Sequence, residues 1–541
     1  MPGFLNLRTW FFRGAWCLLA QQLAACGNSS APAHRAAVQW DADSTTVRVA
    51  AGPQYARGAV WRFFWGQHYR AIWNTPVTAP VLRLASAERD SLLPLRAGGS
   101  YQSRTLRLRT TKGYQFVLRS VDKDMSAALP VGWKRNLLRG LMKDQTSATL
   151  PYGAYVAARL ATAAGVYHAN PRLVYLSDDP FLGKFRADYA NALYLLEERP
   201  EGDQRHARSF GYSPAIYNSR HLLTVLRKRP NAGVDPHTFL RARLLDMWLG
   251  DWSRREDQWR WASFPGPGGT RFRPIPRDRD QAFFRFDDGV FTRVISWFLT
   301  KFQSFHATMR LSNVDALTTT ARNLDRTLLG PLSAADFKAE ADSLQKRLSD
   351  AVIDEALKAG PAETRAVIAV ELAPLLRARR AQLAAVAQRY FEILNTEAWV
   401  VGTDHAERFV VSGAGPGRLR VQLLAIRKHR ADSLISERVY DPQTTRQLNL
   451  YGLDGNDEFR ISPDANVGLR VGIYGGQGEN QLTVSGPSSK AESIAKTLPD
   501  FTLYTTGAPV TASPGIATQP DPHPELTNNA LGWVKHYRLD D

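Results

Sequence analysis

The stretch GDWSRREDQWRW, residues 250–261, gathers three acids, three arginines and three tryptophans directly after an apolar segment. That segment, HTFLRARLLDMWLGD (237–251), has apolar residues at helical spacing, and Gly250 is a typical end of a helix. Two interpretations of the stretch are compatible. Its carboxylates could form a catalytic loop, or its charges could pair around the helix end with Trp252, Trp259 and Trp261 packed beneath them.

The elements on either side predict an α+β fold. Upstream come the glycine turn 98–100, two alternating segments (105–110 and 114–121) joined at Lys112-Gly113, a helix at 151–165, and strands at 172–176 and 192–200. Downstream, 258–264 and 271–276 flank PGPGG and predict a second hairpin, followed by RDRDQAFF (277–284). Residues 291–395 have mainly helical patterns.

This order, with GDWSRREDQW followed by a hairpin and PRDRDQAFF, resembles the CotH family of atypical kinases and, more distantly, the Fam20-type and HipA-type kinases. Those families carry a Gly-Asn-x-Asp-x-His-x-x-Asn loop and a later Pro-Trp-Asp-x-Asp-x-x-Phe. The span 98–290 also resembles a group of Bacteroidetes envelope proteins, some of which continue into an outer-membrane β-barrel. The resemblance implies a bilobal kinase-like core with a helical C-lobe.

The resemblance also implies a nucleotide site with Mg²⁺ or Mn²⁺ and ATP. Gly98, Gly99 and Ser100 would form the phosphate turn, and Arg119 or Lys123 would neutralise phosphate charge. Glu197 and Glu198 would lie at the hinge between the lobes. Asp278 and Asp280 would present carboxylates to the metal, with Gln258 at the position of the family's final Asn. Asp144 is the nearest candidate for the acid that orients the phosphate-binding base.

The catalytic loop departs from the family pattern. Ser253 stands where the family has its catalytic Asp, and Arg255 stands at the His position. A serine cannot accept a proton at neutral pH as a carboxylate can. Asp251 and Asp257 are the candidate replacements for the base, and each projects from a different point of the loop. The pattern therefore predicts a kinase-type core that is degenerate as an enzyme.

The N-terminus predicts export. Both cysteines of the chain, Cys17 and Cys26, lie there, and Arg8 and Arg13 precede a short apolar region that ends in LAAC (23–26). This ending resembles a bacterial lipobox, which implies lipidation at Cys26 and an outer-membrane destination facing the periplasm or the surface. A plain secretory signal cut nearby is the alternative. A lipid would attach the chain to a membrane without a spanning helix.

The net charge of +18 predicts attraction to phosphates, anionic lipids or acidic partners, although codon bias in a GC-rich genome would give the same excess of arginine. No nucleic-acid-binding motif accompanies that charge, so we expect no nucleic acid partner. The aromatic run WRFFWGQHYRAIW (61–73), in a region with a strand-like pattern, is interpreted as a buried structural cluster.

Strand patterns return after about residue 400. YGLDGNDEFRIS (451–462) and YGGQGENQLTVS (474–485) align at a period of 23 residues, which suggests stacked rungs or paired hairpins. Asp454, Asn456 and Asp457 could ligate calcium, although the nine-residue beat of calcium-binding β-rolls is missing. The region after 486, rich in Pro, Ser and Thr, is expected to pack poorly.

The predicted organisation is a signal peptide (1–26), a tether and strand-rich segment (27–97), a kinase-like core (98–395), a β domain (396–486) and a tail (487–541). Within the core, the N-lobe covers about 98–200 and the helical lobe about 201–395. The predicted function is an exported lipoprotein that binds a nucleotide or a phosphorylated ligand. The alternative is a non-catalytic envelope scaffold that associates with an outer-membrane β-barrel partner.

Overall fold

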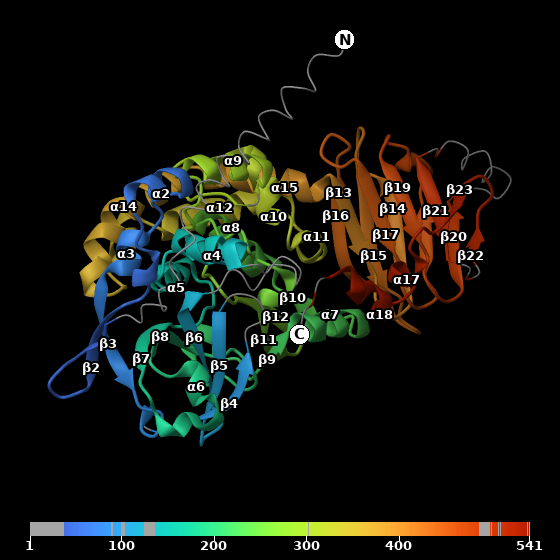
Figure 1. Cartoon of the computed structure of the whole chain (residues 1–541). Coiled ribbons are helices and arrows are strands. Elements are labelled where there is room, and N and C mark those ends of the chain that lie inside the picture. The colour runs from blue at the N-terminus through green and yellow to red at the C-terminus, as the bar shows by residue number, and fades with distance from the viewer. Residues whose placement is uncertain are drawn as a thin grey trace, which may run out of the picture.

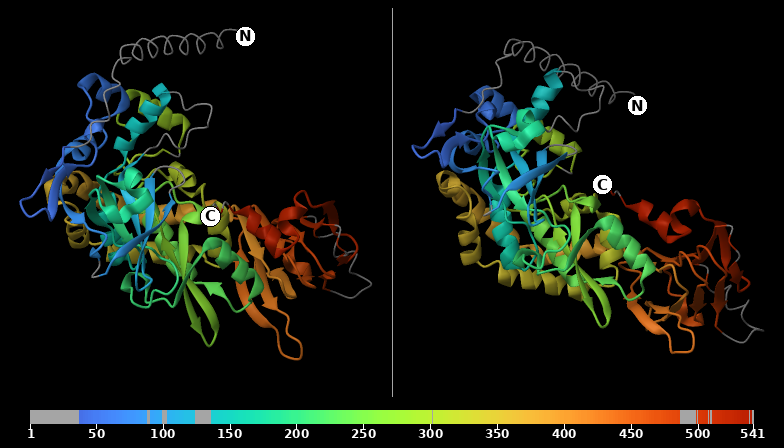
Figure 2. Two further views of the ribbon diagram at one scale, coloured as in Figure 1. Left: turned by 60° about the horizontal axis from the view of Figure 1, so that its bottom comes forward. Right: turned by 90° about the horizontal axis from the view of Figure 1, so that it is seen from below.

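The computed structural model describes residues 37–87, 90–98, 103–123, 136–300, 302–485, 498, 500–506, 508, 510–537 and 539. The chain has an α+β fold, in which two lobes form the core and a separate β domain follows toward the C-terminus (Figure 1). The two further views show the β domain extending to one side of the core (Figure 2). None of the helices in the described ranges has the length and apolarity needed to cross a bilayer.

The first lobe is built on a mixed sheet, which has eight strands among the described residues, in the order β1-β2-β3-β7-β8-β6-β5-β4. The predicted hairpin forms β5 and β6, and the predicted strands at 172–176 and 192–200 form β7 and β8, which pair antiparallel. The predicted boundary at residue 97 falls within this sheet, since β1–β3 also belong to it. Its strands are β1 (Gln39–Trp40), β2 (Thr46–Ala50), β3 (Pro76–Leu82), β4 (Leu92–Gly98), β5 (Ser103–Thr110), β6 (Gln115–Lys123), β7 (Arg172–Leu176) and β8 (Ala192–Glu198).

The aromatic run at 61–73 is helical and only partly buried, which corrects the expectation of a buried cluster in a strand-like region. Trp73 has no exposed surface, whereas Phe63 is 64% exposed. The run spans the end of one helix and most of another, separated by Gly66, whose φ of +98° ends the first helix. The helices between β2 and β8 are α2 (Ala59–Trp65), α3 (Arg70–Asn74), α4 (Asn136–Asp144), α5 (Gly153–Ala164) and α6 (Arg186–Tyr189).

The second lobe is organised around α8 (Pro236–Leu249), the helix predicted from 237–251. Asp235 caps its first turn by accepting a hydrogen bond from the Thr238 amide, and Gly250 ends it with a φ of +71°. The helix is buried over most of its circumference. The helices near it are α7 (Ser219–Lys228), α9 (Val290–Phe298), α10 (Leu311–Thr318), α11 (Arg322–Leu329), α12 (Ala334–Arg347), α13 (Asp350–Leu357), α14 (Ala362–Ala381) and α15 (Leu383–Asn395).

The hairpin predicted around PGPGG is present, with Gly266 opposite Gly269. It belongs to a small sheet in the order β10-β12-β11-β9. These strands are β9 (Ala215–Asn218), β10 (Gly233–Val234), β11 (Trp259–Gly266) and β12 (Gly269–Pro276). The hairpin connects the stretch 250–261 to residues 277–281, so these two acidic segments lie side by side at its base.

The C-terminal β domain is a solenoid of stacked rungs, as one of the two interpretations of the 23-residue period predicted. From β16 onward, successive strands alternate between two sheets, and Asn449 lies beside Gly472 while Glu458 lies beside Gln481. One sheet has β13 (Glu397–Val401), β17 (Gln447–Tyr451), β19 (Arg470–Tyr474), β21 (Phe501–Thr505) and β23 (Ala517–Pro520). The other has β14 (Glu407–Gly413), β15 (Leu419–Ala425), β16 (Ser433–Tyr440), β18 (Glu458–Ile461), β20 (Asn480–Val484) and β22 (Val510–Ala512).

The period places identical residue types above one another. The rings of Tyr451 and Tyr474 stack with centroids 4.6 Å apart, and Tyr504 continues the column at 4.5 Å. Asp454 and Asn456 accept hydrogen bonds from the backbone amides of Ala530 and Glu479. Such bonds give these side chains a structural role, and calcium binding there stays a prediction.

The expectation of a poorly packed tail is wrong for the described residues after 497. They continue the solenoid through β21–β23, and α17 (Pro524–Thr527) and α18 (Ala530–Trp533) then return toward the core. Trp533 is fully buried, and its ring centroid lies 4.7 Å from that of Tyr451. A high content of Pro, Ser and Thr does not exclude packing here, because each rung of a solenoid contributes only a few apolar residues to the core.

A cationic cleft between the lobes

A cleft of about 830 Å³ lies between the two lobes and brings most of the predicted site residues together. Strands β4–β6 and β8 line one side, and the segments after α8 and β12 line the other. The predicted residues that line it are Gly98, Arg119, Lys123, Glu197, Glu198, Asp257, Gln258, Asp278 and Asp280, with Ser253 among them. Gly99, Ser100 and Cys26 lie outside the described residues.

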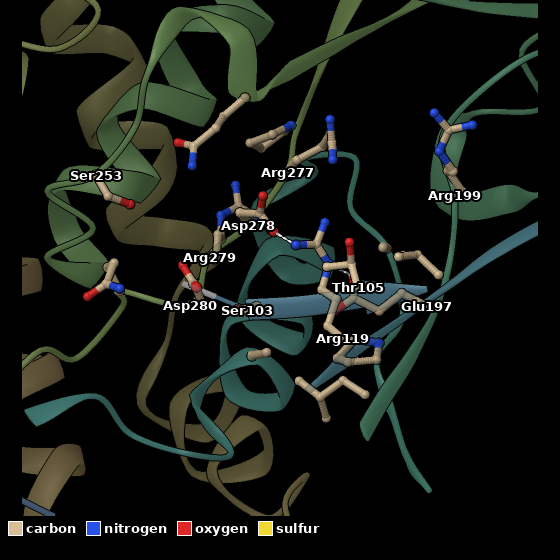
Figure 3. Close-up of a pocket in the computed structure, with 18 of the residues that line it drawn as sticks. Ser103, Thr105, Arg119, Glu197, Arg199, Ser253, Arg277, Asp278, Arg279 and Asp280 are labelled. Atoms are coloured by element: carbon tan, nitrogen blue, oxygen red, sulfur yellow. Dashed lines mark hydrogen bonds and ion pairs between the residues drawn. The ribbon is translucent and has the colours of Figure 1, made fainter. Parts of the chain in front are cut away.

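Two ion pairs cross the cleft from β6 to the segment 277–281. Arg119 pairs with Asp278, as Figure 3 shows, and Lys123 Nζ lies 2.5 Å from Asp280 Oδ2. Arg119 also donates to Glu197 Oε2 over 3.1 Å. Burial alone would raise the pKa of Asp280, but Lys123 and Arg119 lower it below its ordinary value. Both aspartates are therefore already paired with cations of this chain.

A divalent metal does not fit this donor set. Asp278 and Asp280 each bind a cation, and Gln258 Oε1 accepts a hydrogen bond from the Arg255 amide at 3.0 Å. Within the described part of the chain, no three His, Cys, Asp or Glu side chains form a group that could hold a metal ion. The prediction that Gln258, Asp278 and Asp280 bind a metal therefore has no support in the geometry.

The hinge acids have fixed partners. Glu197 is held by Arg119, although burial raises the pKa of the Glu197 carboxyl above its ordinary value. Glu198 accepts a hydrogen bond of 3.0 Å from the backbone amide of Asn170. Both acids lie at the end of β8, where the strand leaves the first lobe, as the prediction of a hinge position requires.

The loop 250–261 is organised by a buried arginine. Arg254 has no exposed surface and pairs with Asp246 at 2.7 Å and with Asp251 at 2.9 Å. It also donates to the carbonyl of Arg277 and so holds the segment after β12 against the loop. Trp259 and Trp261 are fully buried beside it. The ion-pair interpretation of this stretch is thus confirmed, and the loop also presents Ser253, Asp257 and Gln258 to the cleft.

Asp251 does not open onto the cleft, and its role as a replacement for the catalytic base stays a prediction. Asp251 is 1% exposed and is not among the residues that line the cleft. Burial raises the pKa of Asp251 to about 6, and its oxygens bind Arg254 and the amide and hydroxyl of Ser253. Asp257 does line the cleft, but Arg255 donates to both of its carboxylate oxygens over 2.9 Å. The geometry therefore leaves both candidate bases occupied.

The expectation that Asp144 pairs with the cleft cations is wrong. Asp144 is 2% exposed and accepts two hydrogen bonds from Arg70, at 2.9 and 2.6 Å. Arg57 and Trp61 also bind it. Its burial among these groups leaves the partner role to Glu197, Asp278 and Asp280.

Sequence reasoning missed the strongly cationic lining of the cleft. Among the lining residues that the structure describes, ten carry Lys or Arg side chains and five carry carboxylates. The cations are Arg96, Arg107, Arg119, Lys123, Arg199, Arg220, Arg255, Arg260, Arg277 and Arg279. The signal was present in RDRDQAFF, where arginines alternate with the two aspartates.

Arg277 is a partly buried cation of this lining. Within the described ranges, no acidic side chain lies within ion-pair distance of its guanidinium. Burial, and after it the charges of Arg260, Arg119 and Arg199, lower the pKa of Arg277 well below its ordinary value. Figure 3 shows Arg277 beside Asp278 and Arg119, with Ser253 on the opposite side of the view from Glu197 and Arg199. An arginine keeps its proton in proteins, so an anion in the cleft would relieve this repulsion.

Comparisons with known proteins give a distant structural likeness. No protein-family model matches the sequence, and no curated protein matches it. One solved structure that the chain resembles is the Helicobacter pylori proinflammatory kinase CtkA, with 11% sequence identity and a TM-score of 0.30. The likeness covers 57% of this chain and 97% of that one. A TM-score this low carries no argument about fold or activity, so the proposal below depends on the cleft itself.

Proposed function

We propose that the cleft binds a phosphate-bearing ligand, such as a nucleotide, in a kinase-type core that does not transfer the phosphoryl group. The observation that carries this proposal is the lining of the cleft, in which Lys and Arg side chains outnumber carboxylates and Arg277 has no acid within ion-pair distance among the described residues. Arginine presents a planar fork of donors that matches phosphate oxygens bidentately. A bound phosphate would supply the negative charge that the lining acids do not.

The positions of the cations suit an extended anion rather than a single small ion. Arg119 and Lys123 come from the first lobe and Arg277 from the segment after β12. Arg199 follows the hinge strand β8, and Arg260 lies on β11. A chain of phosphates with an attached nucleoside could contact both lobes, as nucleotides do in bilobal kinases.

Phosphoryl transfer lacks its usual groups here. A kinase needs a carboxylate that accepts the proton of the attacking hydroxyl, and it needs bound metal ions. Ser253 stands at the position of that carboxylate, and its hydroxyl donates to Asp251 over 2.9 Å. Asp278 and Asp280 are paired with Arg119 and Lys123. The binding proposal therefore does not require Mg²⁺ or Mn²⁺.

We further propose that the protein is a lipoprotein of the bacterial cell envelope, attached through Cys26 of the LAAC sequence. A Cys26→Ser variant should then be released in soluble form after export. Retention of that variant in the membrane fraction would contradict the lipid anchor. An outer-membrane β-barrel remains the proposed protein partner.

Titration with ATP and with pyrophosphate, each with Mg²⁺ or with EDTA, tests the binding proposal. We expect the midpoint of thermal unfolding to rise with either ligand in EDTA, and Arg277→Gln to weaken binding about tenfold or more. Arg205→Gln is the matched control, because Arg205 is exposed and pairs with Asp203 outside the cleft. An unmoved midpoint at millimolar ligand, with or without the metal, would reject the proposal.

A further inference from the structure

The helix α9 exposes its apolar side. Val290, Val294, Trp297 and Phe298 follow the spacing i, i+4, i+7, i+8, which places them on one face of a helix. All four are exposed, Trp297 by 70% and Phe298 by 77%. The helix buries only Thr292, whose hydroxyl accepts a hydrogen bond from the Gly289 amide. A surface helix of a soluble domain normally has the opposite arrangement.

The helix α2 extends the same surface. Val60 and Phe63 are each 64% exposed, and Phe64 stacks on Phe291 of α9 with centroids 5.1 Å apart. The two helices lie side by side at the top of the molecule, on the core and away from the solenoid (Figure 1). We refer to Val60, Phe63, Val290, Val294, Trp297 and Phe298 as the α2/α9 face. Exposed apolar side chains gathered on two adjoining helices are typical of an interaction site.

Basic groups accompany this face. Arg62 lies on α2, and Arg293, which is exposed, lies on α9. The carboxylates next to α9 are already paired, Asp287 with His306 and Asp288 with His68. Exposed Trp and Phe beside arginines are typical of helices that lie in the interfacial layer of an anionic membrane.

The described chain begins at the same end of the core. In the first sheet, Gln39 lies opposite Arg48, and Arg48 lies opposite Thr78. Residue 37 is therefore level with the start of β3, which follows α3 directly. Thirty-six residues precede it, and the ten from 27 to 36 alone could extend about 35 Å. A segment held at a membrane by Cys26 would leave the α2/α9 face within reach of the lipid.

We propose that the α2/α9 face lies in the interfacial region of an anionic membrane, with Trp297, Phe298 and Phe63 among the acyl chains and Arg62 and Arg293 at the headgroups. This contact fixes which side of the core faces the bilayer. It does not depend on ligand binding in the cleft, so either proposal can fail while the other stands.

Flotation with vesicles tests the energetic part of the proposal. With full-length Cys26→Ser protein and phosphatidylglycerol vesicles, we expect the double substitution Trp297→Ser with Phe298→Ser to reduce binding about tenfold or more. Val370→Ser with Leu531→Ser is the matched control, since these residues are 80% and 70% exposed on other surfaces. Equal reduction in both variants would overturn the proposal. So would a concentration-dependent dimer that only the Trp297/Phe298 variant abolishes, because it would assign the face to a second copy.

Fluorescence quenching by brominated phosphatidylglycerol tests the position of the face, even where residues 1–36 alone hold the chain on the vesicle. Trp297→Phe should remove part of the quenched emission, whereas Trp399→Phe, which alters a tryptophan on β13 of the solenoid, should not. Circular dichroism should show both variants folded. Undiminished quenching in Trp297→Phe would overturn the proposal.

Discussion

Replacing Asp280 by Asn separates the two roles that its carboxylate could have. If Asp280 were a metal ligand, the change would weaken nucleotide binding in the presence of Mg²⁺. In the structure, however, Asp280 pairs with Lys123 at 2.5 Å, and the two side chains are 32% and 9% exposed. A phosphate must therefore compete with Asp280 for this lysine. We expect Asp280→Asn to tighten the binding of pyrophosphate in EDTA.

The size of the effect follows from the charges. A phosphate that contacts Lys123 would lie roughly 6 Å from Asp280, where two unit charges repel by about 3 kcal/mol at an effective dielectric constant of about 20. Solvent in the cleft reduces this repulsion, because Asp280 is one-third exposed. A gain of about 1.4 to about 2.8 kcal/mol corresponds to about tenfold to about hundredfold tighter binding.

Isothermal titration calorimetry with pyrophosphate, at low and at high salt, measures this gain. Asp203→Asn is the control, because Asp203 pairs with Arg205 in an exposed position outside the cleft. Its affinity should equal that of the unaltered chain. Weaker binding by Asp280→Asn, together with binding by the unaltered chain only when Mg²⁺ is present, would refute the counter-ion role and restore the metal-dependent kinase site.

Three further changes test the framework around the cleft. Arg254→Met leaves Asp246 and Asp251 buried without their shared cation, so it should lower the free energy of unfolding by about 3–5 kcal/mol in urea denaturation. Burial raises the pKa of Asp457 to about 8, so the folded state holds a proton that the unfolded state loses, and stability falls as pH rises from 3.8 to about 8. Asp457→Asn should then stabilise the chain at about pH 9 and change little at about pH 4, in denaturation at both values. Gly250→Ala forces a φ of +71° on alanine, with its Cβ 3.1 Å from the Phe305 ring, and should cost about 1–2 kcal/mol, seen as a lower Tm.

Each of these changes has an outcome that contradicts its reasoning. Equal stability of Arg254→Met and the unaltered chain would mean that the buried pairs contribute no more than apolar packing. A stability gain for Asp457→Asn that is the same at both pH values would exclude the proton as its cause. An unchanged Tm for Gly250→Ala would mean that the left-handed residue can relax.

Local patterns predicted the elements of the fold well, because the decisive interactions are close in sequence. The hairpin of β11 and β12 follows from its glycine-rich turn, and α8 follows from apolar spacing between Asp235 and Gly250. The period of 23 residues predicted the rungs, since stacked strands repeat the same side chain at the same position. The tail escaped prediction because Trp533 is buried by residues more than eighty positions earlier, such as Tyr451.

Most residues of the candidate site could be predicted from the sequence, but their ion-pair partners could not. The cleft does bring Gly98, Arg119, Lys123 and Asp280 together, as the order of elements indicated. Which acid binds which cation depends on side-chain directions across the lobes, and Asp251 and Asp144 point into buried networks instead. A sequence does not show whether a carboxylate faces solvent or a guanidinium. The carboxylates to which it assigns the base and metal roles are paired with cations in the structure.

The chain returns from the solenoid to the core, so one wall of the cleft is completed by residues that are synthesised after the solenoid. After β23, the described residues up to 539 return to the second lobe, where Tyr537 shares a hydrogen bond of 2.7 Å with Thr327 of α11 and the Leu539 carbonyl accepts one of 3.0 Å from Arg220 of α7. Leu539 is part of the cleft wall. Because this residue leaves the ribosome after every rung, the wall of the cleft to which it belongs cannot be complete in a nascent core whose solenoid is unfinished.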